Sequence, residues 1–101
     1  MNSDFLKVSK AQADTLIQNW GRYAYKVKVQ QEVGNHRLTA QYTTMPTGDL
    51  HEIVEHSTEC RYGMGKVYPQ NYTSGSDYIL KERLEIRVGK VWYGFYLDGS
   101  H

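Results

Sequence analysis

The segment His51-Glu52-Ile53-Val54-Glu55-His56 places two histidines and two glutamates within six residues. A zinc-protease helix needs histidines four residues apart, so that both rings leave one helical face. Here the spacing is five, which separates the rings by about 140° on a helix and puts them on opposite faces of a strand. We therefore expect no metal or other cofactor at this segment, and interpret it as polar positions flanking two core aliphatic residues.

A second group combines cations with aromatic residues. If residues 78–97 form a hairpin, strand alternation puts Arg83, Arg87, Trp92 and Tyr96 on one face. Further cations of the same outward parity are Lys26, Lys28 and Lys81. Such a face can hold single-stranded nucleic acid by phosphate contact and base stacking.

The structural alternative for this face is that Arg87 covers Trp92 and Arg83 covers Tyr96 through cation–π contact. We favour this alternative, because Glu85 and Asp98 dilute the charge and no RNP-type motif occurs. An exposed Trp92 would indicate a protein interface, since Trp, Tyr and Arg dominate the energetics of such interfaces.

Residue types for metal-free phosphodiester cleavage are also present, namely a histidine, a glutamate base and an arginine for the phosphate. The candidates are Glu52 or Glu55, His51 or His56, Arg83 or Arg87, and His101. Residues of these types are scattered through most domains, so a small ribonuclease is an alternative and the expectation is a protein that is not an enzyme.

The segment 63–77 is rich in Gly, Ser, Asn and Tyr and has no sustained period, which predicts a long loop with a short strand at most at 66–68. Its Gly63-Met64-Gly65-Lys66 stretch lacks the Walker spacing. Tyr68 and Tyr72 have the sequence context of adaptable binding loops, with core packing of one or two tyrosines as the alternative.

The elements that must position these residues are two hairpins. In residues 78–97, Leu84, Ile86 and Val88 alternate with charged positions up to Gly89-Lys90, which suits a two-residue type II′ turn. That turn predicts the cross-strand pairs Val88–Val91, Arg87–Trp92, Ile86–Tyr93, Leu84–Phe95, Arg83–Tyr96 and Lys81–Asp98. Glu82 falls on the inner parity, so we expect the strand to begin after it or to bulge there.

Residues 23–45 form the second predicted hairpin, turning at Gly34-Asn35. Its expected pairs are Val33–His36, Glu32–Arg37, Val29–Ala40 and Val27–Tyr42. Before it, Ser9 and Gln12 have capping-box spacing and predict a helix over about 9–20 that ends at Gly21. Between the hairpins, Pro46–Asp49 indicates a turn, and residues 50–62 fit either a helix or a strand; we favour a strand.

Composition bounds the remaining choices. A chain of 101 residues with 40% hydrophobic residues fits one domain, residues 1–101, and a formal net charge of +1 indicates no global field for nucleic acid or membrane. The single Cys60, whose nearest candidate base is His56, predicts a free, buried or semi-buried thiol in a reducing, cytoplasmic compartment. No apolar run is long enough to span a bilayer, so we expect no membrane partner.

The sequence therefore predicts an α+β fold, with one N-terminal helix on an antiparallel sheet of four to five strands. For function we expect a non-enzymatic binding or inhibitor protein, of the kind that phages and other mobile elements encode, which docks on a protein partner. The expected contact residues are Trp92, Tyr96, Arg83, Arg87, Tyr68 and Tyr72. Single-stranded nucleic acid binding on the basic and aromatic face is the alternative.

Overall fold

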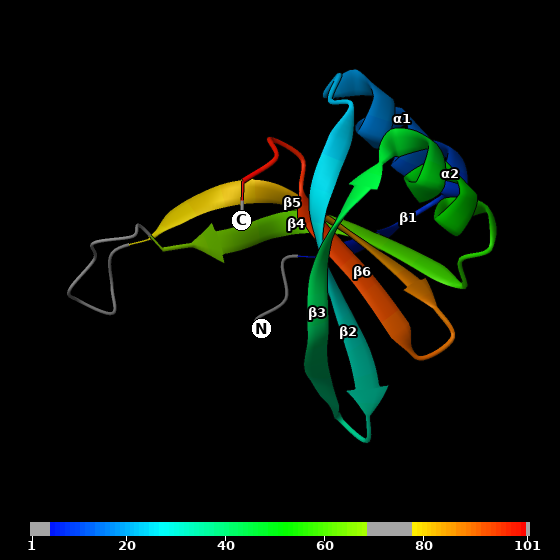
Figure 1. Ribbon diagram of the computed structural model, residues 1–101, viewed down its shortest axis with the longest axis vertical. Coiled ribbons are helices and arrows are strands. Elements are labelled where there is room, and N and C mark those ends of the chain that lie inside the picture. The colour runs from blue at the N-terminus through cyan, green and yellow to red at the C-terminus, as the bar shows by residue number, and fades with distance from the viewer. Residues whose placement is uncertain (1–4, 69–77, 101) are drawn as a thin grey trace.

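The computed structural model is an α+β fold in which two helices cover one face of an antiparallel sheet (Figure 1). It describes residues 5–68 and 78–100. Over these residues the sheet has six strands in the order β1-β4-β5-β6-β2-β3. The elements are β1 (Leu6–Val8), α1 (Lys10–Asn19), β2 (Ala24–Val33), β3 (His36–Pro46), α2 (Thr47–Glu55), β4 (Glu59–Val67), β5 (Ile79–Val88) and β6 (Val91–Tyr96). The predicted class is confirmed, with one more helix and at least one more strand than expected.

Helix α1 begins where the capping box places it. The Ser9 side chain accepts from the Gln12 backbone N–H, and the Gln12 side chain accepts from the Ser9 backbone N–H. The helix ends at Asn19, and Gly21 follows with φ +64°, the left-handed conformation that glycine adopts without strain. Short strand β1 precedes the helix and was not predicted.

The β5–β6 hairpin has the predicted register from Val88–Val91 through Arg83–Tyr96. Gly89, the first central residue of the turn, has φ +64°. Lys90, the second central residue, is not in the positive-φ region, since no described non-glycine residue is. A type II′ turn requires this combination. The expectation about Glu82 is wrong, because β5 begins at Ile79 and pairs with β4 without a register shift. Glu82 instead accepts a hydrogen bond from the Tyr62 hydroxyl, and this bond raises the pKa of Tyr62.

The β2–β3 hairpin has the predicted register only near its turn. Val33 pairs with His36 and Glu32 with Arg37, but the register then shifts between Val29 and Gln30. Val29 consequently pairs with Gln41, and Val27 with Thr43. The unpaired Ala40 is the extra residue of a β-bulge, which the alternation of side chains does not reveal. The bulge moves Tyr42, expected inside, to the opposite face beside Lys28, where its side chain is exposed.

The strand favoured for residues 50–62 is wrong in its first half. Thr47–Glu55 form helix α2, whose N-cap position is the extended Pro46 without a side-chain cap hydrogen bond, and Leu50 and Val54 of this helix are fully buried. The predicted turn at Pro46–Asp49 is the first turn of this helix. Strand β4 then occupies the second half and continues through Gly63 and Gly65, which were expected in a loop. The rest of that predicted loop, 69–77, lies outside the described residues.

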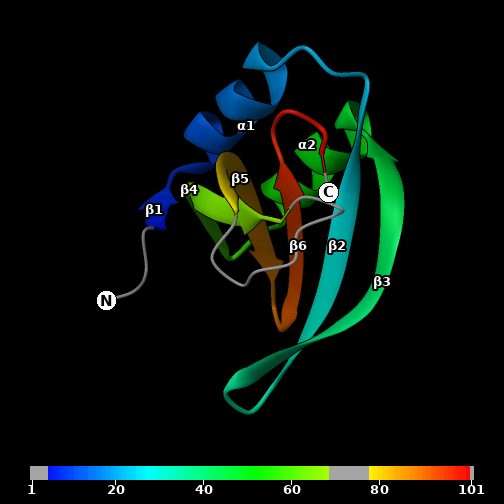
Figure 2. The same cartoon turned by 90° about the vertical axis from the view of Figure 1, so that its left-hand side faces the viewer.

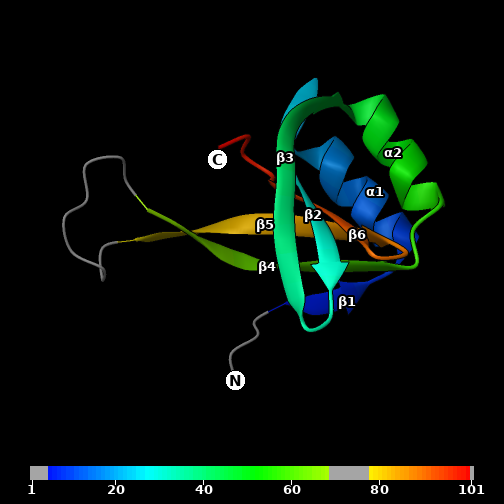
Figure 3. The same ribbon diagram turned by 60° about the horizontal axis from the view of Figure 1, so that its bottom comes forward.

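The hydrophobic core fills the layer between the helices and the sheet, and both helices lie on the same side of the sheet (Figure 3). At its centre Tyr25 contacts Phe95, with ring centroids 4.9 Å apart, and the Tyr25 hydroxyl donates to the Ile17 carbonyl at 3.1 Å. The other buried members are Ala13, Val27, Leu50, Val54, Cys60, Leu84, Ile86 and Leu97. We call this side of the sheet the covered face, and the opposite side the open face.

Two projections extend from this body in different directions (Figure 1). The outer part of the β4–β5 ribbon, residues 63–68 and 78–82, is called the β4–β5 arm here. The other projection is the far end of the β2–β3 hairpin, whose tip bends toward the side of the sheet that holds β4 and β5 (Figure 2). No helix in the described part of the chain has the length and apolar character needed to cross a membrane.

Candidate binding surfaces

Trp92 lies at the centre of the open face, and three arginines cover its side chain. Trp92 is only 3% exposed. Guanidinium carbons lie 3.7 Å (Arg37), 4.9 Å (Arg61) and 5.4 Å (Arg87) from the ring centroid. The indole N–H donates to Glu32 at 2.9 Å. The predicted contact of Arg87 with Trp92 is confirmed, and two further arginines share the ring.

Three carboxylates neutralise most of this positive charge. Glu85 contacts Arg37 at 3.1 Å and Arg83 at 3.4 Å, while Glu59 contacts Arg61 at 2.6 Å. Arg87 contacts both Glu32, at 3.4 Å, and Glu59, at 3.5 Å. The hydrogen bond from Trp92 and the nearby arginines lower the pKa of Glu32. Partial burial opposes ionisation of Glu59, but its hydrogen bond and charge attraction to Arg61 outweigh that effect and lower its pKa.

The contact between Arg37 and Glu85 depends on the coiling of the sheet. Strand β3 lies three positions from β5 in the strand order, which is about 14 Å in a flat sheet. The 3.1 Å contact therefore requires the β2–β3 hairpin to curl over the open face, as its bent tip does in Figure 2. The bulge at Ala40 supplies the extra local twist.

In a second part of the open face, a glycine without a side chain leaves room for Arg83. Arg83 lies flat over Gly94, where an added Cβ would overlap its guanidinium nitrogen Nη2. Its guanidinium carbon is 4.8 Å from the Tyr96 ring centroid, which confirms the predicted contact. The Tyr96 hydroxyl reaches across the sheet and donates to the Lys66 carbonyl at 3.1 Å. A glycine within the aromatic strand β6 was the signal in the sequence for this close approach.

The predicted contact residues thus have different accessibilities. Trp92, Tyr96 and Arg83 are buried, so a partner could touch Trp92 only after Arg37 moved away. Arg87 is partly exposed, Tyr68 is exposed, and Tyr72 lies outside the described residues. A partner-binding role for these residues remains a prediction, and Trp92 does not offer a free surface for base stacking.

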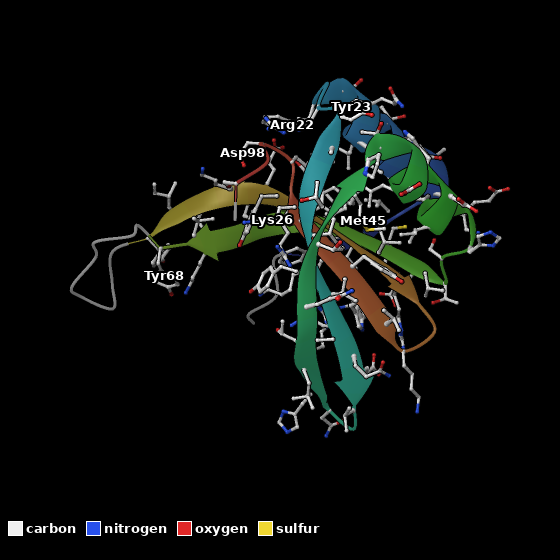
Figure 4. The ribbon with its side chains drawn as sticks, in the orientation of Figure 1. Arg22, Tyr23, Lys26, Met45, Tyr68 and Asp98 are labelled. Atoms are coloured by element: carbon white, nitrogen blue, oxygen red, sulfur yellow. The ribbon has the colours of Figure 1, made fainter. Side chains whose placement is uncertain are left out.

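The near-neutral net charge conceals a separation of charge between the two sides of the sheet. The side chains with open-face parity include eight cations, Lys7, Lys26, Lys28, Arg37, Arg61, Lys81, Arg83 and Arg87, and four carboxylates, Glu32, Glu59, Glu85 and Asp98. The helices carry Asp14, Asp49, Glu52 and Glu55 against Lys10. Figure 4 labels Lys26, one of the exposed cations of this set. Strand alternation already indicated one face for Lys26, Lys28, Lys81, Arg83 and Arg87, and the pairing register adds Lys7 and Arg61.

The ribonuclease candidates do not meet among the described residues. His51, His56, Glu52 and Glu55 belong to α2 or its C-cap on the covered side, whereas Arg83 and Arg87 lie on the open face. His101 lies outside the described residues. His51 instead joins the two helices, with Nδ1 2.7 Å from Asp14 Oδ1 and Nε2 2.6 Å from Gln18 Nε2. In the described part of the chain, no three or more His, Cys, Asp or Glu side chains are arranged so that they could hold a metal ion.

Cys60 is a buried free thiol, 3.5 Å from the Ser57 hydroxyl. Burial raises the pKa of this thiol and so opposes formation of the reactive thiolate. The environment of Cys60 is that of a core residue, as the sequence predicted for a lone cysteine.

The β4–β5 arm carries four large exposed apolar and aromatic side chains on one of its faces. Met64, Leu80, Tyr68 and Tyr78 have the parity of the covered face, but they lie beyond the helices and are 39–52% exposed. The rings of Tyr68 and Tyr78 meet edge to face with centroids 5.9 Å apart, and Lys66 Nζ lies 4.6 Å from the Tyr78 centroid. Figure 4 shows Tyr68 near the far end of the arm.

Comparison of the chain with protein-family models, with curated proteins and with solved structures found no match.

Proposed function

We propose that this chain is a non-enzymatic binding protein that docks on another protein through the β4–β5 arm. The observation that carries the proposal is the group of exposed apolar and aromatic side chains Met64, Leu80, Tyr68 and Tyr78 on one face of that arm. Isolated exposed apolar residues are ordinary, but adjacent ones on a projecting element mark interaction sites.

The pairing of the arm supports this role. Strands β4 and β5 pair without interruption from Glu59–Arg87 to Val67–Ile79, so the arm extends a strand pair that begins in the core. Leu84 and Ile86 of the same strand are fully buried under the helices. A partner would therefore meet a preorganised surface, which reduces the entropy lost on binding.

The kind of protein we infer is a regulator or inhibitor that acts by occupying a partner's surface, as accessory proteins of phages do, in a cytoplasmic setting that suits a buried free thiol. Tyrosine supplies large contact area with few rotatable bonds, which suits this mode of binding. Tyr68 and Tyr78 are the residues for which we expect the largest effects.

The test compares two matched leucines. Wild-type protein, Leu80→Asp and Leu38→Asp are immobilised and exposed to nuclease-treated lysate of the source organism, and crosslinked partners are identified by mass spectrometry. Leu38 is 56% exposed on β3 and Leu80 is 52% exposed on the arm, so both variants add the same charge at similar exposure. We expect one specific protein to be retained by wild type and Leu38→Asp and lost from Leu80→Asp. Equal retention by both variants would contradict docking through the arm.

Single-stranded nucleic acid binding on the open face is a second candidate, because charge separation gives that face a surplus of cations. Lys7, Lys26 and Tyr42 are exposed and Lys28 is partly exposed, with Lys28 Nζ 5.9 Å from the Tyr42 ring centroid. Three phosphate contacts would give a slope of about −2 in a plot of log affinity against log salt. Lys28→Gln should reduce that slope by about 0.7, and a salt-independent affinity would rule this candidate out.

A further inference from the structure

A polar cavity of about 270 Å³ lies between the tip of the β2–β3 hairpin and the arginines around Trp92. It is lined by Glu32, Gly34, Asn35, His36, Arg37, Arg61, Arg87 and Trp92. None of the four side chains assigned to docking on the β4–β5 arm takes part in it. Its volume is below the 300–1,000 Å³ of pockets for drug-sized ligands, so it suits an ion-sized group.

Two of the lining arginines have hydrogen-bond donors without partners. Among the described residues, Arg37 donates only through Nη1, to Glu85, and Arg61 donates only through Nε, to Glu59. Arg87, by contrast, uses all three of its nitrogens, bonding Gly89, Glu59 and Glu32. The free donors are therefore on Arg37 and Arg61, whose side chains are 27% and 36% exposed.

Arg37 and Arg61 line the same cavity, so a ligand in it lies beside both side chains. Their guanidinium carbons lie 3.7 and 4.9 Å from the same ring centroid, so they are at most 8.6 Å apart, the sum of the two distances. Charge-assisted hydrogen bonds from guanidinium to phosphate oxygens are about 2.7–2.9 Å long. A tetrahedral oxyanion between the two groups can accept from both, and the planar donor edge of arginine matches its oxygens.

The charges around the cavity also favour an anion. The network contains four arginines, 37, 61, 83 and 87, and three glutamates, 32, 59 and 85, which leaves one positive charge in excess. Glu32 also lines the cavity and opposes an anion, but its oxygens are engaged by the Trp92 indole N–H and by Arg87. The excess charge lies in a partly buried site, where Coulomb attraction is stronger than in water.

We propose that this cavity binds a phosphate group, held by the free donors of Arg37 and Arg61, with His36 and the Asn35 amide at its rim. The ligand class is a phosphate ion or the terminal phosphate of a small phosphomonoester. Binding would neutralise the excess positive charge of the network and join the hairpin tip to strand β4.

Trp92 fluorescence tests the proposal directly. In a Trp20→Phe background Trp92 is the sole tryptophan, and inorganic phosphate is titrated against sodium chloride at matched ionic strength. We expect a saturable change with phosphate and none with chloride. Adenosine 5′-monophosphate in a parallel titration distinguishes the sources: equal affinity indicates recognition of the phosphate group alone, and tenfold tighter binding indicates a phosphomonoester.

Two variants that each remove one positive charge complete the test. Arg61→Gln leaves Glu59 paired with Arg87, so the fold should persist, and phosphate affinity should fall at least tenfold. Lys81→Gln removes a charge on the same face, where Lys81 contacts Asp98 outside the cavity, and should change affinity less than twofold. A linear response to phosphate, or equal loss in both variants, would overturn the proposal.

Discussion

Substitution of Glu85 by Gln should destabilise the protein strongly, because Glu85 is the carboxylate that balances the most deeply buried arginine. Glu85 and Arg83 are 8% and 6% exposed, and their charged groups are 3.4 Å apart. Arg83 Nη1 is buried without a hydrogen-bond partner in the described residues, so this arginine already has few compensating contacts. Glu85→Gln would leave its positive charge buried and unpaired.

The magnitude follows from two estimates that agree. Unit charges about 4 Å apart attract by about 4 kcal/mol at an effective dielectric constant near 20. Removal of one partner of a buried ion pair typically costs about 3–5 kcal/mol. Since a domain of this size has a free energy of unfolding of about 5–15 kcal/mol, the variant should lose about a fifth of its stability or more.

Urea denaturation followed by circular dichroism measures this loss. The control is Glu52→Gln, which removes the same charge from an exposed position on α2 and should change stability by less than about 0.5 kcal/mol. The double variant Glu85→Gln with Arg83→Met removes both charges and should recover most of the loss. A loss below about 1 kcal/mol for Glu85→Gln would refute the reasoning, since Arg83 would then be solvated or otherwise paired.

Three further predictions test other features. Ser9→Ala should cost about 1 kcal/mol in thermal unfolding, because it removes the acceptor that caps α1. Gly94→Ala should lower the free energy of unfolding by about 1–3 kcal/mol, because the added Cβ would displace Arg83. The control Gly48→Ala in α2, whose Cβ meets no atom within 4 Å, should stabilise the protein by up to about 1 kcal/mol. Equal effects of the two changes would contradict the close approach at Gly94. Burial opposes ionisation of Asp98, but hydrogen bonds from Ser100 and Lys81 prevail and lower its pKa from 3.8 to about 2. Its contribution to stability is therefore present above pH 3.8 and lost as pH falls toward 2; urea titrations of wild type should show a larger acid loss than those of Asp98→Asn.

The sequence determined those features that depend on neighbouring residues. The capping box at Ser9, the left-handed Gly21 and the turn at Gly89-Lys90 are local, because each is set by conformational preferences within a few positions. The register of β5–β6 follows from such a turn, so its cation–π contacts were predictable residue by residue. Helix α2 was harder, since Leu50–Val54 is short enough to fit either period.

Only the tertiary structure decided what the open face presents. Alternation of side chains placed Trp92 outside the hydrophobic core, and that assignment is correct. Trp92 is nevertheless only 3% exposed, because Arg37 and Arg61 cover it from β3 and β4, two strands that do not pair with β6. The shift at Ala40 and the resulting coil of the β2–β3 hairpin depend on how twist accumulates across the whole sheet. The arginine network, its cavity and the separation of charge are consequences of strand order, a property that no single stretch of the sequence encodes.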